Sequence, residues 1–276
     1  MTTTDSERAD AAASGGGPSR VSFACDGDVG RLRLIAGARR NAIDQRFVDE
    51  LGTAVAAIRA APIRALLIDA EGPAFTVGGD LGYIGDRADR LGETLDQMIG
   101  GFHAALGDLG EVEVPVVCAV QGGAAGGGLG LLWLADVVIV ASDLKLATGF
   151  DKLGLSGDGN GSWWLPRLVG LRRAQELLLE GRVLSAREAC EWGIATRAVA
   201  PEALADEALA TARRLAAGPT RALGRIRALL RSSGDVGVRE RLAEEHAAMI
   251  ELGGSEDARA GVTAFAARTR PEFRGR

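Results

Sequence analysis

The pattern of apolar and polar positions predicts strands and helices that alternate along the first part of the chain. Residues 21–35 alternate as a β-hairpin does, and residues 41–60 have the spacing of an amphipathic helix with Asn41 or Asp44 near its start. Short apolar runs predict strands at residues 65–68, 114–121 and 137–142, and a longer periodic segment predicts a helix at residues 91–109. This alternation predicts an α/β fold with a mixed or parallel sheet covered by helices.

The N-terminal segment and the C-terminal part of the chain differ from this alternation of strands and helices. Residues 1–20 are small, polar and rich in glycine, which predicts a disordered tail. Residues 143–149 look like part of a hairpin, and residues 194–199 predict a further strand. Helices are expected at residues 167–181, before this strand, and at residues 202–217, 219–232, 236–252 and 255–267, after it. We therefore predict an α/β core over residues 21–215 and a helical region over residues 216–276 that covers the core or a neighbouring subunit.

A glycine-rich loop separates the strand at residues 114–121 from the next helical pattern. It contains six glycines within the nine residues 122–130. Glycine lets the backbone turn sharply and approach a ligand closely, and a helix that begins there offers unpaired N–H groups with partial positive charge. The loop fits neither the dinucleotide fingerprint, which belongs in a first βαβ unit, nor a P-loop, because no Gly-Lys-Ser/Thr follows. The loop therefore predicts a cradle for an anion or an oxyanion.

A second glycine-containing loop, at residues 75–81, also follows a predicted strand. Backbone N–H groups of Gly79 and Gly127 could then point at one place. Two such donors stabilise the charge that develops on a thioester carbonyl, and losing one typically costs about 3–4 kcal/mol of transition-state stabilisation. The alternative is that both loops are only tight packing turns.

Composition narrows the classes of partner and chemistry. The net charge is −5 with basic residues scattered among acids, so a nucleic-acid partner is not expected. No apolar segment is long enough to cross a membrane, and no signal peptide is apparent. The cysteines Cys25, Cys118 and Cys190 are far apart, which predicts reduced thiols in a cytoplasmic protein, and with only two histidines no metal site is expected. Acid–base chemistry should therefore depend on a carboxylate.

Three segments in order, residues 74–81, 114–142 and 149–199, resemble the crotonase or enoyl-CoA hydratase/isomerase superfamily, and the likeness extends from residue 21 to the C-terminus. The resemblance implies a spiral of ββα turns, an acyl-CoA thioester substrate and an oxyanion hole formed by Gly79 and Gly127. It also implies a homotrimer or homohexamer, with no cofactor apart from the coenzyme A of the substrate.

The two glutamates of that family's hydratases have no counterpart, because Gly130 and Phe150 stand at their positions. Another acid is present: residues 152–167, KLGLSGDGNGSWWLPR, resemble a motif of Δ3,Δ2-enoyl-CoA isomerases and phenylacetate-pathway isomerases, in which Asp158 matches the acid. Gly157 departs from the motif, which has proline there. Residues 255–276 resemble the C-terminal signature of the same branch. Without the resemblance, an aspartate among glycines is equally typical of a turn.

Further candidate residues follow from these motifs. The residues expected to contact the acyl group are Phe75, Val77, Gly78, Asp80, Leu81, Tyr83, Gly126, Gly130, Phe150 and Trp163. Arg268 and Arg270, with Arg274 and Arg276, are candidates for holding the phosphates of coenzyme A. The same arginines would also suit a solvated tail.

Four functions remain open at this stage. We favour an enoyl-CoA isomerase that shifts a double bond with Asp158 as the single proton carrier. A branch that looks similar around Asp158 uses an aspartate as a nucleophile on an aromatic acyl-CoA, in hydrolases or dehalogenases, but its supporting histidine has no clear counterpart here. A hydratase in which Asp158 positions water, and a non-catalytic protein that binds CoA esters, are the other two.

Overall fold

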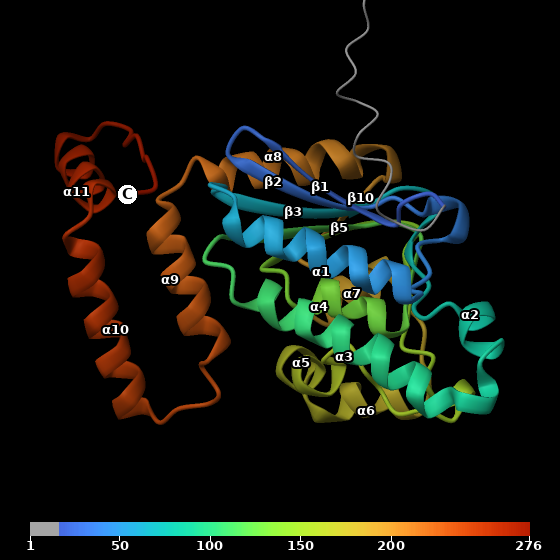
Figure 1. Ribbon diagram of the computed structural model, residues 1–276. Coiled ribbons are helices and arrows are strands. Elements are labelled where there is room, and N and C mark those ends of the chain that lie inside the picture. The colour runs from blue at the N-terminus through green and yellow to red at the C-terminus, as the bar shows by residue number, and fades with distance from the viewer. Residues whose placement is uncertain (1–16) are drawn as a thin grey trace, which may run out of the picture.

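The chain folds into two sheets that share one spiral course, as the computed structural model of residues 17–276 describes (Figure 1). The larger sheet contains, in spatial order, β1 (Val21–Asp26), β2 (Val29–Leu34), β3 (Ala65–Ala70), β5 (Val116–Val120), β7 (Val137–Ala141) and β10 (Arg197–Val199). The smaller sheet contains β4 (Ala74–Thr76), β6 (Gly123–Ala125), β8 (Lys145–Ala147) and β9 (Leu184–Ser185). From β3 onwards, each turn of the chain leaves one strand in each sheet, and this confirms the predicted spiral.

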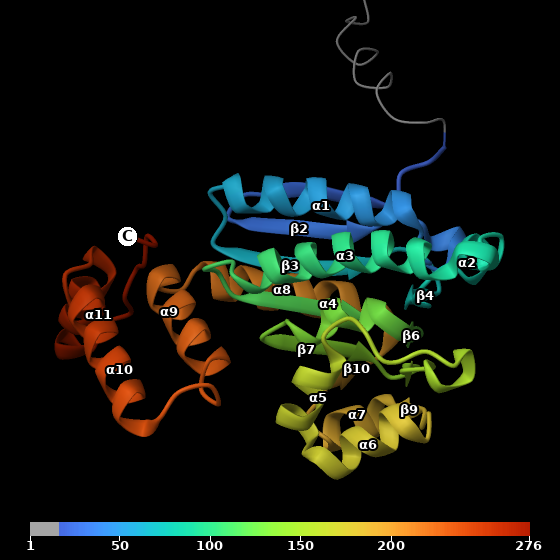
Figure 2. The same cartoon turned by 60° about the horizontal axis from the view of Figure 1, so that its bottom comes forward.

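The helices of the core lie on both faces of the larger sheet (Figures 1 and 2). They are α1 (Gln45–Ala60), α2 (Leu81–Gly85), α3 (Leu91–Gly110), α4 (Gly130–Trp133), α5 (Gly161–Val169), α6 (Leu171–Leu179), α7 (Ala186–Glu191) and α8 (Leu204–Ala216). Helix α1 shows why the sequence forms these elements: Asp44 caps its first turn by accepting the Phe47 N–H, at 2.9 Å, and Phe47, Leu51, Val55 and Ile58 turn one apolar face inward.

The central strands β3, β5 and β7 are apolar except for Asp69, because both of their faces are covered. In β3, Leu66 and Ile68 belong to the core under α1 and α3, whereas Ala65 and Leu67 belong to the core under α8. Strands β2, β3, β5, β7 and β10 run parallel to their neighbours, and only β1 is antiparallel, as the predicted hairpin with β2 requires.

Two sequence-based expectations need adjustment. Residues 143–149 do not form a hairpin with the strand before them: β8 pairs in parallel with β6, and antiparallel with β9. The expected tail lies outside the described residues up to residue 16, but Arg20 is buried and forms an ion pair with Asp44 at 3.1 Å. The folded chain thus begins before residue 21.

The last three helices, α9 (Thr220–Arg231), α10 (Val238–Gly253) and α11 (Glu256–Ala267), stand to one side of the core (Figures 1 and 2). They expose large apolar side chains, among them Leu230, Leu242, Met249, Ile250, Val262 and Phe265. Such a surface suits association with another chain, and the trimer or hexamer stays a prediction.

A buried arginine attaches α9 to the core. Arg227 donates to Asp136 at 2.7 Å and to the carbonyl oxygens of Gly110 and Val112, each at 2.8 Å, and its side chain is only 4% exposed. Burial raises the pKa of Asp136, while Arg227 and the Val116 N–H oppose that rise. Arg227 therefore stabilises the charged form of the Asp136 carboxylate.

We expect Arg227→Met to lower the free energy of unfolding by about 3 kcal/mol, because it removes the charged partner of a partly buried carboxylate and the donor to three carbonyl groups, those of Gly110, Val112 and Leu134. Chemical denaturation measures this change. Arg225→Met, on the same helix, removes an exposed arginine that pairs with Glu251 and should cost less than about 1 kcal/mol. Equal losses in the two variants would contradict the anchoring role of Arg227.

Candidate active site

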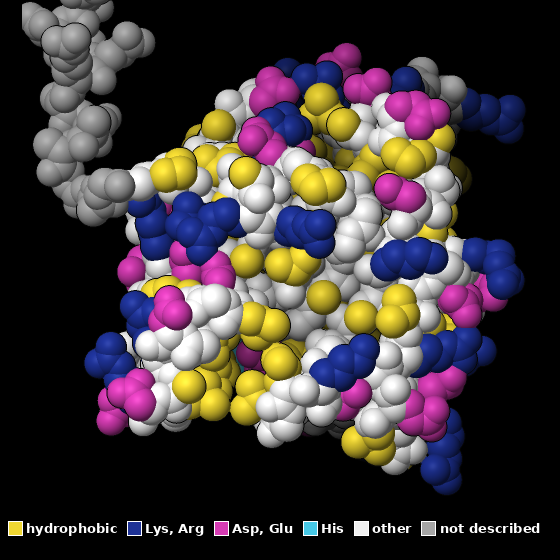
Figure 3. Space-filling view, turned by 90° about the vertical axis from the view of Figure 1, so that its right-hand side faces the viewer, with side chains coloured by type: hydrophobic (Ala, Val, Ile, Leu, Met, Phe, Trp, Pro, Cys, Tyr) yellow, Lys and Arg dark blue, Asp and Glu magenta, His cyan; other side chains and the backbone are white. Residues whose placement is uncertain are grey.

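A mostly apolar cavity of about 360 Å³ lies between α2, α3 and the segment that joins β8 to α5. Its lining includes Ile43, Val77, Gly79, Leu81, Ile84, Leu95, Met98, Ile99, Phe102, Ala125, Gly126, Gly127, Thr148, Gly149, Phe150, Lys152, Leu153, Leu155, Ser156 and Asp158. Figure 3 shows a hollow on this face with apolar side chains gathered around it and basic side chains further out. Such a cavity suits an apolar acyl group with a polar tail that leads to solvent.

The two glycine loops meet at this cavity. Gly78 and Gly126 both have positive φ angles, of 79° and 62°, and a Cβ added to Gly78 would lie 3.1 Å from the Gly126 Cα. Only residues without a side chain allow this approach. The contact brings the segments that carry Gly79 and Gly127 side by side, as the sequence predicted.

The N–H group of Gly79 is left free by the way its loop is held. Ile43 donates to the Gly78 carbonyl and accepts from the Asp80 N–H, both at 2.8 Å, so the peptide N–H between those two bonds does not pair with residue 43. Gly127 lies in the first turn of the short helix at residues Gly126–Leu129, where N–H groups have no partner within the helix. Both glycines line the cavity, and their role as the two oxyanion donors stays a prediction.

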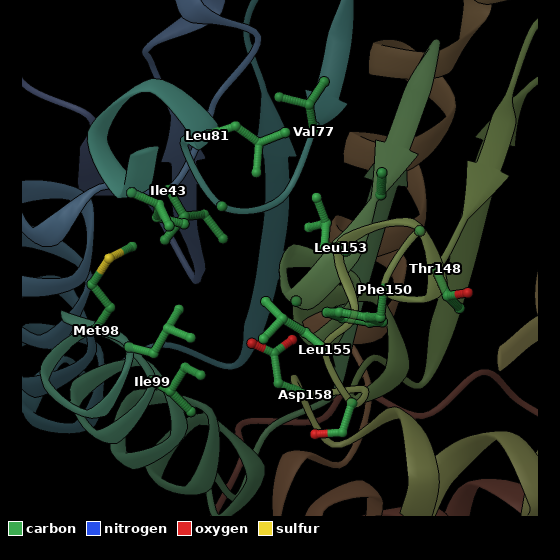
Figure 4. A pocket seen from close by; sticks show the side chains of 18 of the residues that line it. Ile43, Val77, Leu81, Met98, Ile99, Thr148, Phe150, Leu153, Leu155 and Asp158 are labelled. Atoms are coloured by element: carbon green, nitrogen blue, oxygen red, sulfur yellow. The ribbon is translucent and has the colours of Figure 1, made fainter. Parts of the chain in front are cut away.

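Among residues 17–276, Asp158 is the only carboxylate in the cavity lining, and its side chain faces the cavity interior among apolar groups (Figure 4). Its Oδ1 is buried and accepts no hydrogen bond from the described residues. Burial raises the pKa of Asp158 above its ordinary value, and a charge on the neighbouring His103 acts in the opposite direction. A buried carboxyl with a raised pKa is a stronger base than one in solvent, which favours uptake of a proton.

The carboxylate is held against the glycine loop. A Cβ added to Gly127 would overlap with the carboxylate of Asp158, and a Cβ added to Gly159 would overlap with the Gly127 carbonyl oxygen. The acid and one predicted oxyanion donor are therefore parts of the same packed contact.

The other residues predicted for the acyl site fall into two groups. Val77, Leu81, Gly126 and Phe150 line the cavity. Phe75 is instead fully buried in the core, and Gly78 packs against Gly126. The remaining four, Asp80, Tyr83, Gly130 and Trp163, are not part of the lining, for reasons that differ.

Asp80 caps α2 by accepting the Tyr83 N–H at 3.0 Å, and the ring of Tyr83 is covered by Arg87, 3.7 Å from its centroid. Trp163 lines a second, more polar cavity beside α9. The side chains of Asp80, Tyr83 and Trp163 are not part of the cavity lining because each belongs to a different packing contact. Arg268 follows α11, far from α2 in Figure 1, so its role toward coenzyme A, like that of Arg270, stays a prediction.

Sequence reasoning missed one neighbour of Asp158. His103, on α3, accepts the Gly159 N–H through Nε2 at 3.1 Å. A helical histidine was visible in the sequence, but which turn α3 packs against depends on the tertiary fold. The apolar spacing of Leu95, Met98, Ile99 and Phe102 did indicate a packed face, and that face is one wall of the cavity.

Two searches of the described part of the chain bear on other partners. Among residues 17–276, no helix has the length and apolar character needed to cross a membrane. In the same residues, no group of three or more His, Cys, Asp or Glu side chains is arranged to hold a metal ion.

Comparisons with known proteins identify the family of the chain. The family model for enoyl-CoA hydratase/isomerase matches residues 27–276. The 1,2-epoxyphenylacetyl-CoA isomerase of Escherichia coli K12 is 38% identical over 221 residues, 78% of this chain and 82% of that protein. A crystal structure of a protein assigned as an enoyl-CoA hydratase/isomerase, from Mycobacterium abscessus, has 34% identity and a TM-score of 0.89 and covers 93% of this chain and 100% of its own.

The chain belongs to the enoyl-CoA hydratase/isomerase family. It is therefore an acyl-CoA-processing enzyme with the crotonase fold. Members of the family differ in their reactions: the 4-chlorobenzoyl coenzyme A dehalogenase-1 of an Arthrobacter species is 32% identical over 166 residues, 60% of each chain. The family therefore includes more than one reaction.

The position of the first missing glutamate is closed by packing. A Cβ added to Gly130 would lie 2.5 Å from Leu106 Cδ1 and 2.8 Å from the Gly159 carbonyl oxygen. The glycine at 130 is thus required by the local structure and leaves no space for a longer side chain.

We expect Gly130→Ala to destabilise the protein by about 1–3 kcal/mol, because the new methyl group must displace Leu106 or the backbone beside Asp158. Thermal unfolding of the purified variant measures this. Gly107→Ala, on the exposed side of α3 with nothing within 4 Å of its added Cβ, is the matched control and should be neutral or stabilising. An unchanged midpoint for Gly130→Ala would show that the contact is not restrictive.

Proposed function

We propose that this enzyme is an enoyl-CoA isomerase that moves a double bond between positions 3 and 2 of an apolar acyl thioester. The observation that carries the proposal is a single carboxylate, Asp158, buried without a hydrogen-bond donor on Oδ1 and packed against the glycine loop of Gly127. Isomerisation needs one proton carrier, whereas hydration needs one group to activate water and another to deliver a proton.

The reaction balances with these groups alone. Asp158 takes a proton from C2 of a 3-enoyl thioester, and the electron pair forms a dienolate whose oxygen receives hydrogen bonds from the N–H groups of Gly79 and Gly127. As the dienolate collapses, the double bond forms between C2 and C3, and Asp158 returns the proton to C4. The apolar walls exclude water, which would otherwise exchange or add to the intermediate.

We expect Asp158→Asn to reduce isomerisation of 3-enoyl-CoA by a factor of about 10²–10⁴, because an amide cannot take up the C2 proton. The assay follows double-bond position by absorbance and mass spectrometry in D2O, where incorporation of deuterium at C2 or C4 reports proton transfer. Asp151→Asn, which changes an exposed aspartate outside the cavity lining, is the control and should retain full activity. Undiminished isomerisation by Asp158→Asn would rule the mechanism out.

The pH dependence gives the same proposal a second test. The base form of Asp158 must be ionised, and burial raises its pKa. The rate should therefore fall as the pH drops through that raised pKa, at a higher pH than an exposed aspartate, with its ordinary pKa near 3.9, would give. If the rate instead fell only at a pH at or below the ordinary aspartate pKa, the base would not be a buried carboxylate.

One observation favours a second candidate function. His103 lies beside Asp158, and this is the type of neighbour that an aspartate nucleophile requires. In that reaction Asp158 would displace a leaving group from an activated aromatic acyl-CoA to form an aryl ester. Water, deprotonated by His103, would then hydrolyse the ester and regenerate the carboxylate.

Substituting His103 separates the two candidates. Glutamine can place an uncharged acceptor near the position of Nε2 but is not a base, so His103→Gln should retain isomerisation within about threefold. The same variant would abolish halide release from a 4-halobenzoyl-CoA if the second candidate were correct. Halide release by the native enzyme, with no double-bond shift, would replace the isomerase proposal by this one.

A further inference from the structure

The direction of the Gly79 N–H depends on how firmly residues 78 and 80 are held. Their backbone bonds to Ile43 define where the peptide lies, but these bonds end at Asp80, from which α2 begins. The N–H group of Gly79 shares the planar peptide of the Gly78 carbonyl, which Ile43 holds, so it turns when a shift at the Asp80 end of the loop strains that bond. The attachment of Asp80 is therefore the point at which the predicted oxyanion donor can be misaligned.

The carboxylate of Asp80 makes two separate attachments. Oδ1 accepts the Tyr83 N–H at 3.0 Å, and Oδ2 receives the guanidinium of Arg39. Burial alone would raise the pKa of Asp80, but the Tyr83 N–H and Arg39 outweigh it and the pKa is lowered. Asp80 is thus a charged group whose position is set from both sides.

Arg39 extends this attachment to the rest of the fold. Its guanidinium also lies 3.4 Å from Oδ2 of Asp44, the residue that caps α1. Asp44 in turn pairs with the buried Arg20. Four alternating charges therefore connect the segment before β1, the start of α1 and the loop of Gly79.

We propose that Arg39 is a positioning residue for the predicted oxyanion hole, in that its bridge between Asp44 and Asp80 holds the Gly79 N–H toward the thioester carbonyl. This inference rests on the proposed function. The side chain of Arg39 is 44% exposed, and an ion pair formed by so exposed a group adds little to stability. Its consequence should therefore appear in turnover and carbonyl polarisation rather than in the midpoint of unfolding.

The experiment compares Arg39→Met with the native enzyme, using both turnover of 3-enoyl-CoA and the absorption of bound 4-dimethylaminocinnamoyl-CoA. The absorption of this thioester shifts to the red when its carbonyl is polarised, whether or not Asp158 transfers a proton. In Arg39→Met we expect kcat to fall about tenfold while KM stays within threefold of the native value. The red shift of the bound probe should fall below half of that in the native enzyme. Arg39→Lys should recover part of both effects, because it retains the charge but loses the planar fork.

Two further variants make the test specific. Arg59→Met removes another surface arginine, 48% exposed and paired with Asp108, and should change neither quantity. Asp80→Asn should match Arg39→Met, and the double variant should be no worse than either single one, because both act through one contact.

The outcomes distinguish this inference from the proposed function. A full red shift in Arg39→Met, no red shift in the native enzyme, or additive losses in the double variant would overturn the role of Arg39. If the native enzyme polarises the probe but never isomerises 3-enoyl-CoA, and Arg39→Met loses the shift, the proposed function fails and the positioning role stands.

Discussion

The backbone contact between the glycine loop and the turn that carries Asp158 constrains the whole site. Neither Gly127 nor Gly159 could carry a Cβ without overlap with the other segment. The contact places a carboxylate directly beside a predicted oxyanion donor, and the parallel pairing of β6 with β8 in the smaller sheet brings the glycine loop after β6 and the segment after β8 close enough for it to form. A side chain at either glycine would separate the acid from the donor and disturb both.

The chemistry follows from what surrounds that contact. Aliphatic side chains from α2 and α3 and from the segment after β8 exclude water, so the carboxylate of Asp158 is a stronger base than one in solvent. The site of the first missing glutamate is filled by Leu106 and the Gly159 carbonyl. Packing around Gly130 therefore leaves no space for a glutamate there, and in the proposed reaction Asp158 carries one proton between two carbon atoms.

Local sequence signals predicted much of this arrangement. The spiral, the helical C-terminal region and the meeting of the two glycine loops followed from periodicity, glycine spacing and family resemblance. Side-chain direction was harder to predict, because it depends on packing between distant segments. Thus Phe75 turned into the core and Trp163 toward a different cavity, whereas His103 on α3 reached the turn of Asp158. No local pattern distinguishes these outcomes.

In the proposed reaction, one acid and two backbone donors act on the same thioester. A crystal structure of the protein with a bound, unreactive 3-thia acyl-CoA tests this most directly. We expect a thioester oxygen about 2.7–3.1 Å from the nitrogens of both Gly79 and Gly127, with the Asp158 carboxylate beside C2. A carbonyl that contacts neither nitrogen, or an acyl chain bound outside the cavity of Asp158, would contradict it.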